Sequence, residues 1–329
     1  MWGEQLMSSF EVRSGEILFV KSVKDGIPNR DPLNDGDARR LFGEEDGRIS
    51  LSDVSIKRDV RDYILARYPD GGPDHRYHVF VRKQFKEDGK TLLGRGSLAE
   101  EIKKQSGIDS DDMKEVLCRA AVDVRLFGAV YSVSKSNFQL TGPVQFGWAH
   151  SLHPVESVYT QGTVVMPSRD AKDEKGDGDG EGATQGTIWT TYLVPFAVFV
   201  MPAIVNATIA QQTGMDQRDL DLLLEALWKG TLHRQARGRG IQQPLFLLHI
   251  EYNDPFFRIG YLEDALRLEP GPEEWRRGNR PTSLDGVKLD VTRLVDRVNH
   301  YASEVARVRY WIDPRLKLVG ELPWEKQEW

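Results

Sequence analysis

The apolar stretch 189–205 (WTTYLVPFAVFVMPAIV) limits the possible folds of this chain more than any other segment. It falls short of the roughly 20 residues needed to cross a bilayer, and Pro195 and Pro202 interrupt it. Because proline removes a backbone donor and breaks a helix, the stretch is predicted to form a turn and a buried strand. We therefore expect a globular core built around a sheet, and no membrane association.

Strands and helices alternate along the rest of the chain. Residues 16–23 (EILFVKSV) are predicted to form a buried strand, and Ser52 is a predicted N-cap of a helix that ends before Pro69. Asp216 is predicted to cap a second helix, with a leucine face and a stop at Gly230. Further strands are predicted at 75–83, 121–133, 138–148 and 245–252, and further helices at 111–119 and 290–306. This order is typical of an α+β sheet that contains a split β-α-β unit with large insertions.

Residues 168–186 (SRDAKDEKGDGDGEGATQG) hold no large apolar side chain. Such a segment cannot bury enough surface to offset the entropy lost on ordering, so we predict a flexible tip. Its flanks, 164–166 and 188–190, are predicted to pair as a projecting hairpin. The segment holds six acids and three bases, so it supplies half of the net charge of −6 and leaves the remaining chain near neutral.

A net negative charge argues against a protein that coats nucleic acid indiscriminately, because phosphate binding scales with lysine and arginine contacts. Two local clusters of cations run against this balance. The first, on the helix after Ser52, consists of Lys57, Arg58 and Arg61, which together could hold consecutive phosphates. Composition alone favours an ordinary solvated face with Asp59 and Asp62 as partners.

The second cluster lies in the segment HRQARGRG, residues 233–240. Arg234, Arg237 and Arg239 alternate with small or polar residues, and arginine forks match phosphate oxygens. A basic loop after a helix C-terminus explains the pattern equally well, since cations are favoured there. From the residues alone the two interpretations stand level.

Other groups in the chain carry weaker chemical signals. Acids in the loop 24–48 could hold Mg²⁺, but Asp-Pro and Asp-Gly are common turn sequences, which we favour. Two H-x-x-H pairs, beginning at His75 and His150, would face opposite sides of a strand. The only cysteine, Cys118, excludes a disulfide framework, and no nucleotide-binding or catalytic motif occurs. We therefore expect no cofactor, no bound metal and no catalytic residue.

Several blocks of the sequence match a known family in their order. They are ILFVKSVKDGIPNRDPLNDGDARRLF (17–42), ISLSDVSIKRDVRDYI (49–64), DVRLFG (123–128) and TGPVQFGWAHSLHPV (141–155). Together they resemble the repeating backbone subunit of type I CRISPR effector complexes (Cascade), most closely the subtype I-B and I-C group. Each block alone is a weak signal, whereas their joint presence is specific.

The resemblance implies a fold and a division of the chain. The core of that family is a palm, which is a modified RNA-recognition-motif (ferredoxin-like) sheet, with a fingers insertion and a thumb hairpin. The expected parts are the first palm strand and helix at 1–69, fingers at 70–120, palm or fingers strands at 121–149, the thumb at 150–190 with its tip at 168–186, and the rest of the palm at 191–329.

The resemblance also implies a role in antiviral defence. Copies of the chain would assemble head-to-tail along one CRISPR RNA in the cytoplasm, beside other Cascade subunits. They would hold the RNA backbone while the guide pairs with a target DNA strand. The residues expected to contact RNA are Ser52, Lys57, Arg58 and Arg61 on the first helix, Arg125 in DVRLFG, Lys24, Asn29, Arg30 and Arg39 after the first strand, and Arg234, Arg237 and Arg239 on chemical grounds.

An alternative activity comes from the same loop. Related backbone subunits of type III complexes cut RNA with an aspartate after the first strand, so Asp25 or Asp31 could serve a metal-dependent endoribonuclease. The basic helix and the DVRLFG block favour the non-catalytic type I scaffold.

Overall fold

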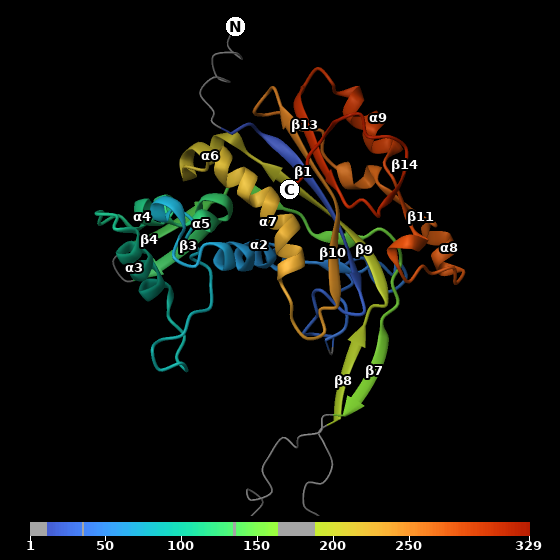
Figure 1. Ribbon diagram of the computed structural model, residues 1–329, viewed down its shortest axis with the longest axis horizontal. Helices are drawn as coiled ribbons and strands as arrows, with labels where there is room; N and C mark the ends of the chain where they lie inside the picture. Colours follow the sequence, from blue (N-terminus) through green and yellow to red (C-terminus); the bar gives the residue numbers. More distant parts are fainter. Residues whose placement is uncertain (1–11, 35, 134–135, 164–187) are drawn as a thin grey trace, which may run out of the picture.

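A computed structural model describes residues 12–34, 36–133, 136–163 and 188–329 (Figure 1). Its centre is an eight-stranded, mostly antiparallel sheet in which β5 (Val144–Phe146) pairs with β9 outside the main strand order. That order is β15 (Glu325–Lys326), β13 (Val305–Ile312), β10 (Ile241–Tyr252), β1 (Gly15–Lys24), β9 (Phe196–Val205), β6 (Ala149–Ser151) and β2 (Ser50–Leu51). The predicted α+β class is confirmed.

The strand predicted around Pro202 lies inside the sheet as β9. Pro202 is paired with Leu18 of β1, and its carbonyl accepts a bond from the Gly147 N–H on the other side. Because the N–H and C=O of one residue point the same way in an antiparallel strand, the missing donor faces the gap between β5 and β6. The proline therefore costs the sheet no ladder bond.

Two layers cover the two faces of the sheet (Figure 1). The helices α2 (Asp53–Arg67), α6 (Ala207–Thr213) and α7 (Gln217–His233) pack on the face that carries Phe19 and Leu247. The opposite face carries Leu18 and Phe246. Its cover consists of β11 (Arg267–Glu269), α8 (Pro272–Arg276), β12 (Lys288–Asp290), α9 (Thr292–His300) and β14 (Lys317–Val319), with short 3₁₀ turns at Leu262–Ala265 and Leu284–Gly286. Strands with apolar side chains on both faces are thus buried from both sides.

A separate apolar cluster surrounds the helices α3 (Arg95–Ser106) and α4 (Met113–Ala120). It includes the hairpin of β3 (Gly128–Val133) and β4 (Ser136–Thr141). The sequence predicted α4 but missed α3, whose apolar residues Leu98, Ala99 and Ile102 are few and lie among many charges. The strand predicted at 75–83 is wrong: a 3₁₀ turn at Pro73–His75 is followed by irregular chain that forms one isolated bridge to Ala121.

The strand predicted over 121–133 is half wrong, because its first half is the helix α5 (Val122–Phe127). A short apolar run does not distinguish a buried strand from a buried helix. The helix ends at Gly128, which has a φ of +74° and whose Cβ, if present, would lie 2.1 Å from the Leu140 carbonyl oxygen. Only glycine therefore fits where the chain turns from α5 into β3.

Two helix ends also differ from expectation. Asp216 caps α7 as predicted, with a capping box to Asp219, but the helix continues through Gly230 to His233. A Cβ on Gly230 would lie 2.5 Å from the Asp59 carbonyl oxygen, so this glycine permits the close approach of α7 to α2. The helix expected at 290–306 ends at His300, because the valine pattern continues into β13.

The predicted hairpin is present as β7 (Val158–Thr163) and β8 (Ile188–Leu193), which project away from the sheet (Figure 1). Residues 188–190 pair with 161–163, and their predicted partners at 164–166 lie outside the described residues. The predicted tip at 168–186 lies outside the described residues. None of the helices in the described chain is long and apolar enough to cross a membrane.

Stability should fall in mild acid because of His153, which is fully buried and stacks on Trp275. Its Nε2 accepts a bond from the Val198 N–H, and burial lowers the pKa of His153 to about 4. An unfolded histidine has a pKa of about 6.5, so as pH falls from about 6.5 to about 4 only the unfolded chain takes up the proton. His153 alone should then lower the free energy of unfolding by about 3 kcal/mol.

Chemical denaturation of His153→Gln between those pH values should show a shallower pH dependence than the original chain. His233→Asn is the matched control, because His233 is exposed, and it should keep the full slope. An unchanged slope in His153→Gln would contradict the assignment.

Candidate nucleic-acid interface

The carboxyl end of β1 gathers most of the cations singled out by sequence. Lys24, its last residue, lies opposite Phe196 and Ile241, the first residues of β9 and β10. The loop after β1, the start of α2, the end of α7 and the base of the hairpin therefore meet at this end of the sheet. Residues that are far apart in the sequence therefore lie close together in space at this end of the sheet.

The first two predicted helix cations are held in surface ion pairs. Lys57 contacts Asp53 at 2.9 Å, and Arg58 contacts Asp62 at 2.7 Å, each one turn away on α2. The Arg58 side chain is 47% exposed, and an exposed i,i+4 pair is worth only about 0.3–0.5 kcal/mol, so a phosphate can replace Asp62 there at little cost. The Lys57 side chain is more enclosed, at 15% exposed.

Arg61, the third helix cation, is more deeply set. Its Nε donates to Asp123 at 2.8 Å, and its side chain is 11% exposed. The guanidinium carbon lies 5.3 Å from the ring centroid of Phe127, and the Lys57 ammonium lies 5.6 Å from the same centroid. Phe127 packs in turn on Phe146, at 5.7 Å between ring centroids. Two cations thus lie within cation–π distance of one aromatic ring.

The loop after β1 is attached to its surroundings on both sides. The Ser52 hydroxyl donates to Asn29 Oδ1 at 3.1 Å, and Arg30 Nη2 donates to the Thr191 hydroxyl of β8 at 2.5 Å. Lys24 and Arg30 are exposed. Arg39 pairs with Asp31 at 3.7 Å and lies 5.5 Å from the Trp148 ring centroid.

The three arginines after α7 separate in the structure. Arg237 is exposed and lies 5.0 Å from the ring centroid of Trp189 on the hairpin. Arg234 and Arg239 instead turn inward to Asp59, at 2.8 and 3.1 Å, where Lys21 is the third partner at 2.9 Å. Arg239 also donates to the Pro28 carbonyl at 3.0 Å, which ties down the loop after β1.

Burial and charge act in opposite directions in this cluster. Burial by itself would raise the pKa of Asp59, but Lys21, Arg239 and Arg234 hold it below its usual value. Burial lowers the pKa of Lys21, against the attraction of Asp59. The carboxylate therefore stays charged and is the common partner of three cations.

Arg125 lies inside the protein, 1% exposed. Its Nε and Nη2 donate to Asp219 at 2.6 and 2.8 Å, and Nη2 also donates to the Arg76 carbonyl. Its Nη1 donates to the carbonyls of Cys118 and Arg119. A guanidinium committed in this way has no donor left for an external ligand, and its role is to fasten α5 to α7.

Apart from the inward-facing Arg125, Arg234 and Arg239, we call the predicted cations and their polar neighbours the cationic edge, comprising Lys24, Asn29, Arg30, Arg39, Ser52, Lys57, Arg58, Arg61 and Arg237. The sequence did not single out the aromatic and hydroxyl partners that hold them, among which are Phe127, Trp189 and Thr191. No local signal marks these partners, because they lie on elements distant in the chain.

The acids considered for metal chemistry are engaged in turns. Asp25 has a φ of +56°, and Asp31 accepts the Leu33 N–H as well as pairing with Arg39. The rings of His75 and His78 stack with centroids 6.1 Å apart, and burial lowers the pKa of His78 to about 4. In the described ranges, no three His, Cys, Asp or Glu side chains gather as a metal site would require.

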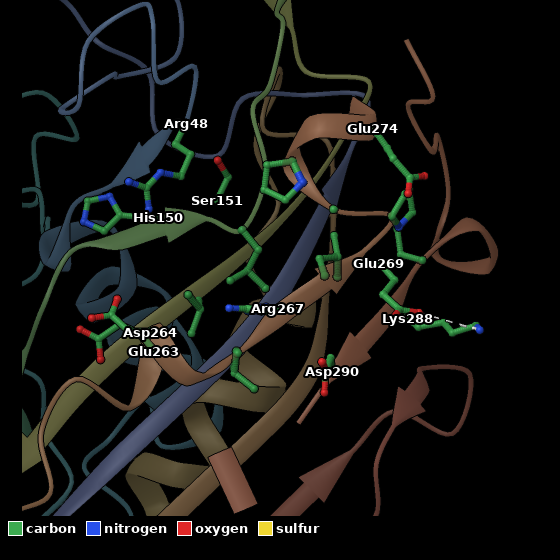
Figure 2. A pocket seen from close by; sticks show the side chains of 18 of the residues that line it. Arg48, His150, Ser151, Glu263, Asp264, Arg267, Glu269, Glu274, Lys288 and Asp290 are labelled. Atoms are coloured by element: carbon green, nitrogen blue, oxygen red, sulfur yellow. Dashed lines mark ion pairs between the residues drawn. The ribbon is translucent and has the colours of Figure 1, made fainter. Parts of the chain in front are cut away.

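A groove of about 1370 Å³ lies away from the cationic edge, on the other face of the sheet (Figure 2). Arg48 and His150 form one wall, and Glu263, Arg267 and Lys288 lie across it. Acids and bases alternate in its lining, so it has no excess of positive charge for a polyanion. None of the residues predicted to contact RNA lines it.

Comparison with known proteins yields one family. Residues 13–292 match the family model described as CRISPR-associated protein Cas7. A CRISPR-associated protein Cas7 from Haloferax volcanii is 26% identical over 330 residues, covering 93% of this chain and 89% of the relative.

Two solved structures are similar in fold. A chain of a "CRISPR RNA-guided surveillance complex, pre-nicking" superimposes with a TM-score of 0.52 at 14% identity, covering 94% of this chain and 97% of that one. A chain of a second CRISPR RNA-guided surveillance complex gives 0.49 at 16% identity, with 94% and 95% covered. At this identity the first likeness establishes a shared fold alone.

Arg125→Ala should destabilise the protein by about 3–5 kcal/mol, because it leaves Asp219 as a buried charge that has lost its main partner. Equilibrium denaturation measures the change. Arg119→Ala is the matched control, since that side chain is 59% exposed and, among the residues that the structure describes, pairs only with Glu115, so it should cost less than about 0.5 kcal/mol. Equal effects of the two substitutions would contradict the structural role of Arg125.

Proposed function

The chain belongs to the Cas7 family of CRISPR-associated proteins, and we propose that it is a CRISPR RNA-binding backbone subunit of a type I effector complex. The family match over residues 13–292 carries this proposal. The cationic edge is where we expect the RNA backbone to lie. In this role the protein supports the guide while base pairing with the target DNA strand reads sequence.

The topology supports a modified RNA-recognition-motif palm. The chain passes through β1, α2, β6, β9, α7 and β10, and the four strands are ordered β10-β1-β9-β6. A ferredoxin-like β-α-β-β-α-β unit has this order and antiparallel pairing. We propose that residues 1–69 and 191–329 supply most of this palm.

The two remaining parts project from that unit. The separate apolar cluster of α3, α4, β3 and β4 supports a fingers insertion at 70–120 that continues into 121–149. The β7–β8 hairpin supports a thumb within 150–190. A head-to-tail row of copies would then present the same cationic edge repeatedly along one RNA.

Cations at the cationic edge suit a backbone and not a base sequence. Lysine and arginine bind phosphate oxygens at any nucleotide, so contacts of this kind hold the RNA without reading its base sequence. Lys24, Arg30, Lys57, Arg58 and Arg237 are proposed as phosphate contacts, with Asn29, Arg39, Ser52 and Arg61 beside them. Arg125, Arg234 and Arg239 are proposed to support this surface from within, since buried acids hold them.

The proposed role is that of a scaffold in the cytoplasm, working with other effector subunits. The net charge of −6 does not oppose it, because several copies would share one RNA and each needs only a local groove. Of the two residues considered for an endoribonuclease, Asp25 and Asp31, the latter is engaged by Arg39 and by the turn that it initiates.

Removing two cations of α2 should weaken RNA binding by the full chain. Lys57→Gln combined with Arg58→Gln should reduce the salt slope of binding to a single-stranded RNA by about 1.4, since each phosphate contact on a single strand contributes about 0.7. Fluorescence anisotropy across a salt series measures it. The control Arg307→Gln removes an exposed cation on β13 and should leave the salt slope unchanged. An unchanged salt slope in the double variant would contradict the proposal that RNA binds at the cationic edge.

A scaffold should not cut RNA. Incubation of the assembled complex with Mg²⁺ and a labelled RNA complementary to the guide should leave that RNA intact. Asp31→Ala should behave identically in the same gel assay. Regularly spaced cleavage that disappears in Asp31→Ala would instead establish the endoribonuclease.

A further inference from the structure

Asp123 is a buried carboxylate in the first turn of α5 that directly contacts the cationic edge. It is fully buried, and its Oδ2 accepts from Arg61 Nε at 2.8 Å. The backbone N–H groups of Phe80 and Val81 also donate to it, at 2.8 and 3.1 Å. These two backbone bonds fix the carboxylate in place independently of Arg61.

Only one of the three guanidinium nitrogens of Arg61 is used by this contact. Among the described residues, Nη1 and Nη2 make no hydrogen bond, and neither is among the polar atoms sealed from solvent. The four N–H groups on these nitrogens are therefore available to an external acceptor. A phosphate can accept from such a fork through two oxygens.

The aromatic ring beneath Arg61 comes from the same helix as its acid partner. Asp123 and Phe127 are four residues apart on α5, so they share one helix face. The carboxylate holds the edge of the guanidinium, and the ring, 5.3 Å from its central carbon, supports its face. The Lys57 ammonium, 5.6 Å from the centroid of the same ring, adds a second cation to this site.

We propose that Asp123 is a positioning residue for RNA binding: it holds Arg61 by Nε so that Nη1 and Nη2 meet a backbone phosphate. The inference rests on the proposed RNA-binding function and deepens it. An acidic residue next to the bound polyanion thus strengthens binding, because it fixes a flexible side chain before the ligand arrives.

Asp123→Asn and Asp62→Asn form a matched test, because both remove one negative charge beside an arginine of α2. Charge alone predicts tighter RNA binding by both variants. Positioning predicts that Asp62→Asn binds as tightly as the original chain or more tightly, whereas Asp123→Asn binds roughly tenfold more weakly. The salt slope of Asp123→Asn should also fall by about 0.7, the loss of one phosphate contact.

A double-substitution cycle separates positioning from a structural role. Arg61→Gln should weaken binding about as much as Asp123→Asn, and adding Asp123→Asn to Arg61→Gln should bring no further loss of affinity. Anisotropy with a labelled single-stranded RNA and the full chain measures all four forms, and circular dichroism establishes that each is folded.

Several outcomes would overturn the proposal. Equal weakening of binding by Asp123→Asn in the Arg61→Gln background would mean a general structural effect. Tight binding by folded Asp123→Asn together with weak binding by Arg61→Gln would show that Asp123 does not position Arg61. The proposed RNA surface would still stand. If both Arg61→Gln and the Lys57/Arg58 double variant bind RNA normally, the cationic edge is not the RNA-binding surface.

Discussion

The buried carboxylate of Asp59 joins the parts of the molecule on which the cationic edge depends. It receives Lys21 from the central strand, Arg234 from the end of α7 and Arg239 from the loop beyond. Removing one partner from such a cluster leaves uncompensated buried charge, which typically costs about 3–5 kcal/mol. Because Arg239 also fixes the loop 24–30, the same interaction that holds α2 on the sheet sets where the exposed cations stand.

Two further buried aspartates repeat this arrangement in the region around α5. Asp219 on α7 forms an ion pair with Arg125, and Asp123 on α5 forms one with Arg61. In the DVRLFG block, the side chains of the acid, the arginine and the phenylalanine each make a separate contact, and the glycine permits the turn from α5 into β3. Packing beneath the cationic edge therefore explains this block of the family resemblance.

Charge balance looks different once burial is known. Buried acids on the helix side of the sheet pair with inward-facing arginines, and within the described ranges no ion pair engages the exposed cations Lys24, Arg30 and Arg237. A chain with a net charge of −6 can thus still offer a positive rim to a phosphate backbone. Distribution matters more than the sum.

The sequence by itself determined the central strands, the helices α2 and α7 and the projecting hairpin, because each has a local period, a cap or a turn composition. It also located the cationic positions and the family. The form of 121–127 and the existence of α3 needed tertiary packing, since short apolar runs are ambiguous. Only the folded chain decided which arginines face outward, because Asp59 lies 180 residues from Arg239 and Asp219 lies 94 from Arg125, and no local pattern encodes such pairs.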